Sequence, residues 1–556
     1  MNGLLMRDRG QMDPARLFLT FWLVIVVSLT LFYRLETAPM PYHYDFGTCS
    51  ADVATMARSF VNHGVLALGG VPINNNPPLG LSPSAYTHWP PLLPIILSAC
   101  FRIFGESEAT AHGLMLVVVL ASASLLFWIA DLCLGRTAAF LAAFCWLTLP
   151  TVVHWGHVLL QESLAVLFIL AALLAFLKAT DSAEIQWAWA VPGGIAVALA
   201  AWSSWESVLL SPGLLAAALW SRRPSQQRLA LIYASLALMA TVTLVAWYAI
   251  RYPGLMADTW QTAKFRMGLA STYSNELLHR YSGEARMSLP GMIFNLARLH
   301  WHELGLLGLS ATAWVILTGL EARACRKGSA LVLAFCGLLA PWLLWCVLMP
   351  NHVANHNFET LIAAPAVAMA LAWGGREALH VLSRSPQARL GLGSLVVLLI
   401  VPALMLEPLG EVVWNNLEWH RGMGWRGLLP SVKLPPHSIE PDPSMRFADE
   451  IREIAGPDAV ILTPVPGMVH VYYSRRHFIR AITDDDLLDR AIPQAAAAFP
   501  GSPLYLALRA AERPSFPKAL ARYSAVRVSP NLILLALEQR QASRGNVPTE
   551  IMFSPK

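Results

Sequence analysis

Residues 113–130, GLMLVVVLASASLLFWIA, form a run of 18 residues without a charged side chain. This length is close to the ~20 apolar residues that a helix needs to cross the hydrocarbon core of a bilayer. Further apolar runs begin near Leu17, Ala138, Ser163, Trp187, Ser207, Leu229, Leu304, Leu331, Leu361 and Gly393. The sequence therefore predicts a mostly α-helical, polytopic transmembrane bundle of about eleven spans.

The composition of the 556 residues excludes an ordinary soluble protein. The chain is 56% hydrophobic and 13% charged, with a mean hydropathy of +0.49, whereas soluble domains carry about 25% charged residues. The net charge of +5 is modest, and the arginines stand in short loops between apolar runs. Such a pattern indicates membrane orientation, so no nucleic-acid partner is predicted.

The charge asymmetry of the loops predicts the orientation. By the positive-inside rule the short basic loops face the cytoplasm. Their basic residues are Arg7, Arg9, Arg16, Arg136, Lys178, Arg222, Arg223, Arg323, Arg326, Lys327, Arg376, Arg384 and Arg389. The N-terminus is then cytoplasmic, while loops 34–112 and 251–302 and the region after 408 lie outside. We expect an integral protein of a bacterial inner membrane.

The composition changes after the last apolar run and predicts three parts. Residues 1–408 form the membrane domain, 409–439 a proline-rich linker, and 440–556 a small extracytoplasmic α/β domain. In the last part, MRFADEIREIAG has the period of an amphipathic helix that stops at Gly456. DAVILTP, MVHVYYS, SAVRVS and LILLALEQ are interpreted as strands.

The long first outer loop carries the acids of greatest interest. Asp45 stands in YHYDFGT, after His43 and just beyond the first apolar run. A carboxylate at a membrane edge is costly to bury and tends to mark function. The following stretch VATMARSFVNHG predicts a short amphipathic helix with Arg58 facing water or headgroups. Asp52 is interpreted as the N-cap of this helix, with a catalytic role as its alternative.

Histidines and a tryptophan accompany these acids at the same predicted face. His88 and Trp89 stand at the head of PPLLPIILSACFRIFG, a short apolar helix that we expect to be interfacial or re-entrant. His88 at a helix start is suited to an anionic group, and Trp89 is alternatively an interfacial anchor. In HWGHVLLQES, His154, His157 and Glu162 surround the next outer turn.

Two later outer segments add further polar candidates. PNHVANHNFETL brings His352, His356 and Glu359 before an apolar run, which fits either a lipid-phosphate or sugar site or a hydrated turn. Lys264 and Arg266 in the long loop 251–302 are cations able to clamp a phosphate or to contact anionic lipid headgroups. In WSSWES, Trp202, Trp205 and Glu206 form a third outer turn whose aromatic faces suit sugar rings, although tryptophan belts are ordinary at interfaces.

No metal or cofactor is predicted from the remaining motifs. The seven cysteines show no CxxC or Cys/His ligand spacing. The run Asp484, Asp485 and Asp486 has no partner acid, so we interpret it as a solvated turn or a helix cap.

Several of these motifs together resemble the C-type glycosyltransferases of membranes, a group that includes protein O-mannosyltransferases and the lipid A aminoarabinose transferase. They are the acid after the first span, the helix ending in AR…HG, the PPL…FG helix, GRTAAFLAAFCWLTLP, the acid-bearing turn, and HNF…P near residue 365. The layout matches over about the first 400 residues. Two departures stand out: Trp89 occupies a position that is lysine in some members, and Phe46 follows the first acid in place of the common Glu.

The resemblance implies transfer of a sugar from a polyprenyl-phosphate donor to a glycan, lipid or protein acceptor on the outer membrane face. It places the general base or acceptor-positioning role on Asp45 and the second acid on Glu162, and Asp52 remains a rival base. A nucleotide-binding signature is missing from the sequence, which favours a lipid-linked donor over a nucleotide sugar. We expect the transfer to be inverting. The alternatives are a transporter or lipid flippase, whose acids would stand at mid-membrane, or a non-catalytic assembly scaffold.

Overall fold

The computed structural model describes residues 14–38, 42, 44–74, 86–221, 223–270, 287–322, 330–382, 443–464, 467–479 and 482–537. The chain forms two compact units, which are described separately. Of the described residues, those up to 382 belong to the first unit and those from 443 to the second. The predicted span near Gly393, the predicted linker at 409–439 and the candidate His43 lie outside the described residues.

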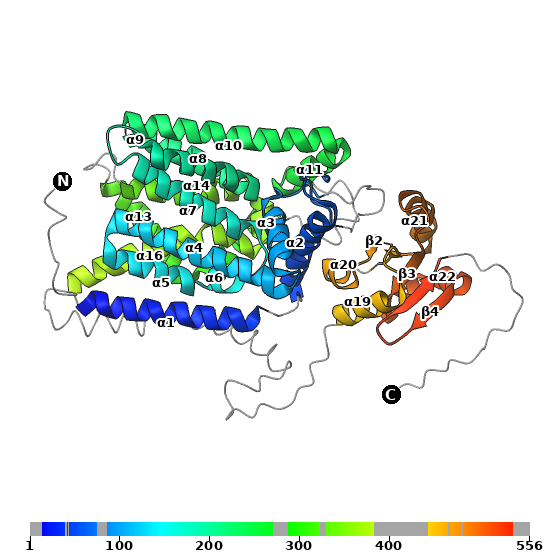
Figure 1. Cartoon of the computed structure of the whole chain (residues 1–556). Coiled ribbons are helices and arrows are strands. Elements are labelled where there is room, and N and C mark those ends of the chain that lie inside the picture. Colours follow the sequence, from blue (N-terminus) through cyan, green and yellow to red (C-terminus); the bar gives the residue numbers. More distant parts are fainter. Residues whose placement is uncertain are drawn as a thin grey trace, which may run out of the picture. The chain divides into compact units, whose positions relative to one another are not determined.

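The described part of the first unit is built from helices (Figure 1). They are α1 (Pro14–Thr37), α2 (Tyr44–His63), α3 (Leu92–Phe104), α4 (Glu108–Leu134), α5 (Arg136–Thr148), α6 (Pro150–Trp155), α7 (Gln161–Ala179), α8 (Trp187–Ser203), η1 (Glu206–Leu209), α9 (Leu210–Ser221), α10 (Pro224–Arg251), α11 (Pro253–Arg266), α13 (Leu289–Ala322), α14 (Ala330–Leu348), α15 (Pro350–Asn355), η2 (Asn357–Ile362) and α16 (Ala364–Leu382).

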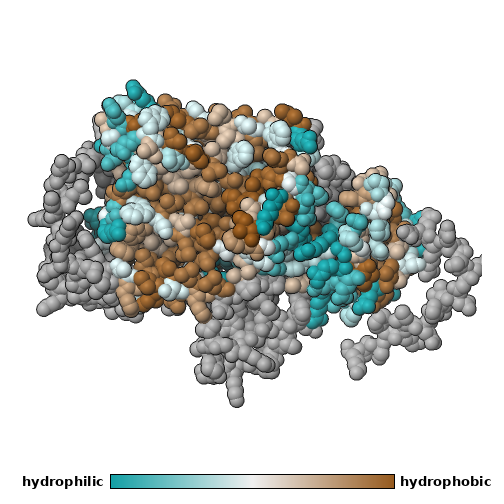
Figure 2. Space-filling view, in the orientation of Figure 1, coloured by the Kyte–Doolittle hydropathy of each residue, from teal (hydrophilic) through white to brown (hydrophobic). Residues whose placement is uncertain are grey.

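The surface of this unit is suited to lipid. Within the described residues, α4, α7, α10 and α14 are each long and apolar enough to cross a membrane. Hydrophobic side chains cover the middle of the bundle (Figure 2), and Val117, Leu238 and Val347 are more than half exposed. Apolar surface of this extent is unfavourable in water. The predicted helical membrane bundle is confirmed, whereas the count of eleven spans is not.

Small residues allow close helix packing at the centre of the bundle. Gly193 of α8 leaves no room for a Cβ, because the hydroxyl of Tyr233 on α10 occupies that space. The same hydroxyl donates a hydrogen bond of 3.1 Å to the carbonyl of Ala190. Such approach of small residues is how helices associate where lipid provides no hydrophobic driving force between them.

Successive long helices run in alternate directions, so the C-termini of one set lie at the same end of the bundle as the N-termini of the other set. The C-termini of α1, α8, α10 and α14 lie at the same end as the N-termini of α4, α7, α13 and α16. Helices α2, α3 and α11 lie at this end, to the right in Figure 1. We refer to it as the α2 end of the bundle.

Helix α2 is longer than the sequence predicts. It begins at Tyr44 and ends at His63, where Gly64 adopts a φ of +85° that suits glycine. Asp45 is therefore the second residue of α2, although its side chain lies outside the described residues. Asp52 lies in the interior of the helix, so its interpretation as an N-cap is wrong.

The second unit contains a mixed sheet. Its helices are α19 (Pro443–Ile454), α20 (Met468–Ser474), α21 (Asp485–Ala498), η4 (Ala510–Ser515) and α22 (Pro517–Arg522); its strands are β1 (Val460–Leu462), β2 (His477–Ile479), β3 (Leu504–Leu508), β4 (Ser524–Val528) and β5 (Ile533–Ala536). The strand order is β2-β1-β3-β5-β4. β1 is parallel to β2 and β3, and β5 is antiparallel to β3 and β4. The predicted small α/β fold is confirmed.

One predicted strand of this unit is wrong. MVHVYYS forms helix α20, which packs against α19 with Met468, Val471 and Tyr472 buried. Its β-branched and aromatic residues favour a strand, but tertiary packing overrides such preferences in a segment of seven residues. Strands β2 and β3 were not predicted, because their short apolar runs resemble buried helix segments equally well.

His470 of α20 makes the stability of this unit depend on pH. Its side chain is 2% exposed, and its Nε2 accepts a hydrogen bond of 3.3 Å from Arg509. Burial, aided by the charge of Arg509, lowers the pKa of His470 to about 3. Below pH 6.5 the unfolded chain therefore binds a proton that the folded chain does not, and the folded state loses stability as pH falls toward 3.

We predict that His470 destabilises the second unit by about 2 kcal/mol at pH 5 relative to pH 7. The measurement is denaturant-dependent proteolysis within residues 443–537 of the full chain, with the wild type compared with His470→Leu. The leucine variant loses the contact with Arg509 but should show a pH dependence weaker by that amount. An identical pH dependence in the two proteins would contradict the assignment.

Candidate site at the α2 end of the bundle

Glu162 is brought to the α2 end by the short turn that precedes α7. It is the second residue of α7, and its side chain is 1% exposed. In the same turn, the backbone N–H of Leu159 donates a hydrogen bond of 3.1 Å to the hydroxyl of Ser50 on α2. This bond fastens the helix that carries Asp45 to the start of the helix that carries Glu162.

The charges that act on Cys49 show that acids of α2 and α7 lie near each other. Burial, aided by the negative charges of Asp52 and Glu162, raises the pKa of the Cys49 thiol to about 12. Cys49 and Asp52 both belong to α2. Asp52 and Glu162 therefore both lie near Cys49. The convergence of Asp45 with Glu162 stays a prediction, because the side chain of Asp45 lies outside the described residues.

Two more buried carboxylates join Glu162. Glu206 begins η1 and is 0% exposed, and Glu359 of η2 is 1% exposed. Electrostatic interactions link all three carboxylates with one another, and Arg266 acts on Glu162 and Glu206. Glu206 was not among the predicted site residues, although WSSWES carried the signal: an acid at the end of a span, as at Glu162.

Glu359 lies against a buried histidine. Its Oε1 lies 2.7 Å from Nε2 of His352, and both side chains are 1% exposed. The His352 ring lies 4.3 Å from the ring of His356 and 5.9 Å from that of Trp89, between centroids. Four predicted site residues from two distant segments are thus brought together.

Arg266 lies next to this group, at the C-terminal end of α11. Its guanidinium carbon is 5.7 Å from the centre of the Trp89 ring, within the range of a cation–π contact. Its charge also acts on Tyr86, whose pKa is raised well above its ordinary value by burial and by Asp52. Tyr86 was not predicted, because a tyrosine in a proline-rich loop carries little signal.

Side chains of the first loop are fixed by hydrogen bonds to other elements. Trp205 Nε1 donates to the carbonyl of His88 at 2.7 Å. The hydroxyls of Thr87 and Thr259 lie 2.7 Å apart, which connects the loop to α11. These contacts position residues 86–89 beside Arg266 and Glu206.

Other predicted site residues lie elsewhere. Arg58 is buried rather than facing water, because it forms an ion pair of 2.5 Å with Glu106. His154 Nδ1 lies 3.5 Å from Glu303, which also accepts a hydrogen bond of 3.2 Å from Asn357. The ring centroid of His157 is 6.0 Å from that of His112, and Lys264 is half-buried on α11.

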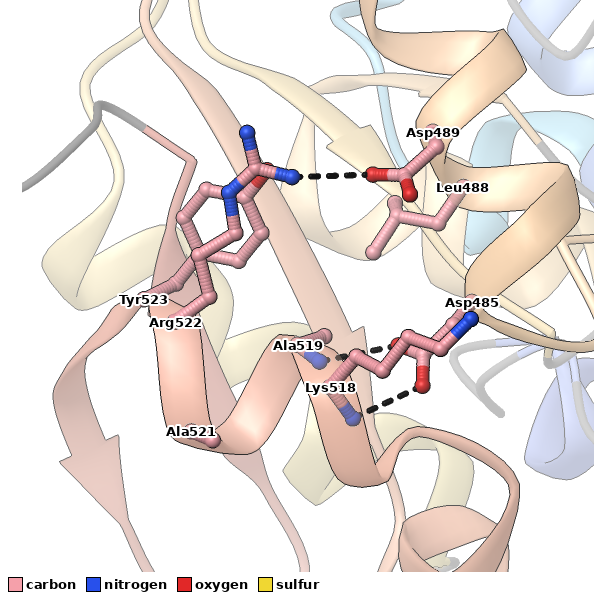
Figure 3. A pocket seen from close by; sticks show the side chains of 8 residues that line it. All are labelled: Asp485, Leu488, Asp489, Lys518, Ala519, Ala521, Arg522 and Tyr523. Carbon is pink, nitrogen blue, oxygen red and sulfur yellow. Dashed lines mark hydrogen bonds and ion pairs between the residues drawn. The ribbon is translucent and has the colours of Figure 1, made fainter.

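The acidic run of the second unit serves as helix caps. Asp484 accepts a hydrogen bond of 2.9 Å from the N–H of Leu487 at the start of α21. Asp485 accepts bonds of 2.8 and 2.9 Å from the N–H groups of Lys518 and Ala519. Figure 3 shows Asp485 with Lys518 and Ala519, and the Arg522–Asp489 ion pair of 3.2 Å, around a pocket that these residues line. The cap interpretation is confirmed.

In the described part of the chain, no three His, Cys, Asp or Glu side chains are grouped so as to hold a metal ion. The three glutamates at the α2 end interact electrostatically, without such a ligand geometry. The arrangement suits recognition of hydrogen-bond donors beside a cation and an aromatic ring.

Comparisons with known proteins agree with this fold. Residues 88–247 match the family model of dolichyl-phosphate-mannose-protein mannosyltransferases. No curated protein matches the chain by sequence.

Among solved structures, ArnT from Cupriavidus metallidurans bound to undecaprenyl phosphate is 16% identical, with a TM-score of 0.56, over 93% of this chain and 98% of that one. Archaeal oligosaccharyltransferase AglB from Archaeoglobus fulgidus, in complex with an inhibitory peptide and a dolichol-phosphate, is 14% identical, with a TM-score of 0.53, over 88% and 70%. The predicted resemblance to C-type membrane glycosyltransferases is confirmed.

The buried His352–Glu359 pair should contribute strongly to stability. Replacing Glu359 by Ala leaves a buried imidazole without its partner and should lower the free energy of unfolding by about 3 kcal/mol. The double variant His352→Leu, Glu359→Leu should lose less than the sum of the two single leucine variants. Thermal unfolding in detergent micelles compares the four variants with the wild type, and additive losses in the leucine variants would contradict the pairing.

Proposed function

We propose that this chain is a glycosyltransferase that moves a hexose or pentose from a polyprenyl-phosphate donor to an acceptor at the extracytoplasmic membrane face. The observation that carries the proposal is the convergence of Glu162, Glu206, Glu359 and Arg266 at the α2 end. The family match and the fold of ArnT and AglB support it. An acid cluster at one end of the bundle favours transfer over transport, for which mid-membrane charges are expected.

The proposed mechanism is inverting. Asp45 accepts the proton of the acceptor nucleophile, which attacks the anomeric carbon of the donor sugar. The bond to the lipid phosphate breaks on the opposite side, and the departing phosphate gains negative charge. Arg266 stabilises that charge, because a guanidinium matches phosphate oxygens with paired donors. Asp52 is the rival base, since it lies on the same helix and near Glu162.

The remaining assignments follow the same proposal. Residues 1–408 form the catalytic membrane domain, 409–439 the linker and 440–556 an extracytoplasmic domain that helps to select the acceptor. The N-terminus is cytoplasmic and the membrane is a bacterial inner membrane. The partners are the lipid-linked donor, membrane lipids and a glycan, lipid or protein acceptor.

Asp45 is tested by comparison with Asp52. We predict that Asp45→Asn lowers transfer in membranes about 100-fold or more, as expected when a general base is lost. Asp52→Asn should have a much smaller effect. The measurement is mass spectrometry of envelope glycolipids and glycans in cells that express equal amounts of each variant. Unchanged turnover with Asp45→Asn and a collapse with Asp52→Asn would transfer the role to Asp52.

Arg266 is tested with the bare lipid carrier. We predict that Arg266→Gln weakens the binding of undecaprenyl phosphate by the purified chain about 10- to 100-fold, because a charge-assisted hydrogen bond is lost. Lys264→Gln is the matched control: it removes a cation two residues away, on another face of α11. Equal losses with the two variants would indicate general attraction of anions rather than a phosphate contact at Arg266.

A further inference from the structure

Glu162 and Glu206 differ from the other buried glutamates of the described residues. Of the four such side chains, Glu359 pairs with His352, and Glu303 contacts His154 and Asn357. Glu162 and Glu206 form no ion pair with a basic side chain that the structure describes. Neither side-chain oxygen of Glu162 accepts a hydrogen bond from another described residue.

Burial of such groups lowers stability unless something compensates. A carboxylate taken out of water loses its hydration, and the loss is restored only by hydrogen bonds or by a paired charge. Buried polar groups without partners are rare in native proteins, and each calls for a specific explanation. Among the described residues, Glu162 without a hydrogen-bond partner, and Glu206 with Ser204 as its one side-chain neighbour able to donate, indicate a site whose donors arrive with a ligand.

The charges around the two carboxylates identify the kind of donor. Arg266 acts electrostatically on both without forming a direct pair, and Glu359 is balanced by His352. Glu162 also lies in the first turn of α7, where the helix dipole favours negative charge. Burial penalises the charged form of both groups, so their oxygens need neutral hydrogen-bond donors rather than a further charge. Sugar hydroxyls are neutral donors of this kind.

We infer that Glu162 and Glu206 form the subsite for the donor's sugar ring, accepting hydrogen bonds from its hydroxyls while Arg266 holds the phosphate. This inference rests on the proposed function, because it places the sugar next to a lipid phosphate at Arg266. It makes Glu206 a specificity-determining residue, distinct from the base on α2. The hydroxyls that the two carboxylates can reach decide which sugar is accepted.

The test separates recognition of the sugar from recognition of the lipid. The full chain in lipid nanodiscs is titrated with undecaprenyl phosphate alone, and with undecaprenyl phosphate carrying mannose, glucose or arabinose. The wild type should bind at least one sugar-bearing lipid about tenfold more tightly than the bare lipid. Glu206→Ala should remove that preference and change the Kd of the bare lipid less than about threefold.

Two further variants keep the test decisive if the alanine variant does not fold. Glu206→Gln has the same shape and keeps an acceptor oxygen, so it should retain most of the preference. It should also melt at an equal or higher temperature without ligand, because a neutral amide of the same shape replaces a carboxyl group whose charged form burial penalises. If the role of Glu206 were merely structural, the Glu206→Gln variant would melt at a lower temperature than the wild type. Glu303→Gln, at a buried glutamate that already has partners, should leave the preference unchanged.

Each outcome has a definite meaning. The inference is overturned if Glu206→Ala weakens the binding of the bare and the sugar-bearing lipids equally. It is also overturned if all variants retain the preference for the sugar-bearing lipid. A Glu206→Gln variant as impaired as the alanine variant indicates a cationic ligand and also overturns it. A wild type that binds no undecaprenyl phosphate contradicts the proposed function itself, and one that binds every lipid equally contradicts only the sugar subsite.

Discussion

The burial of carboxylates at one end of a membrane bundle is the constraint around which the rest of this structure is arranged. Glu162, Glu206 and Glu359 are each at most 1% exposed, and desolvation makes charged groups in such a position unfavourable by several kcal/mol each. The chain offsets this with the His352–Glu359 pair, with the charge of Arg266 and with helix starts at Glu162 and Glu206. Stability alone would favour apolar residues at these positions, so their presence indicates a function.

The surrounding elements hold this cluster through bonds to backbone atoms. Ser50 accepts from the N–H of Leu159, Trp205 donates to the carbonyl of His88, and Trp247 donates to the carbonyl of Gly69 at 2.6 Å. These contacts connect α2, the first loop and the ends of α7, α8 and α10. Because these contacts are made by neighbouring elements, the positions of the cluster side chains are set before a ligand binds, which lowers the ordering required on binding.

The sequence predicted the parts of the fold that depend on hydropathy and helix periodicity. Apolar runs placed α4, α7, α10 and α14, and the period of residues 445–456 placed α19. Glu162, Trp89, His352 and Glu359 were predicted as site residues from polar side chains at span ends, and the structure brings them together. Glu206, Tyr86 and the burial of Arg58 were missed, since tertiary packing decides which of many polar residues at loop ends turn inward. The helix at MVHVYYS was missed for the same reason, because contact with α19 outweighs local β preference.

The proposed function requires a lipid phosphate to bind beside Arg266. The most direct measurement is an experimental structure of the full chain with undecaprenyl phosphate bound in a lipid nanodisc. We predict that the phosphate lies within hydrogen-bonding distance of Arg266, at the same end of the bundle as Asp45, with Glu162 and Glu206 lining the space where a sugar would stand. A phosphate bound at the opposite end of the bundle, or away from these glutamates, would contradict it.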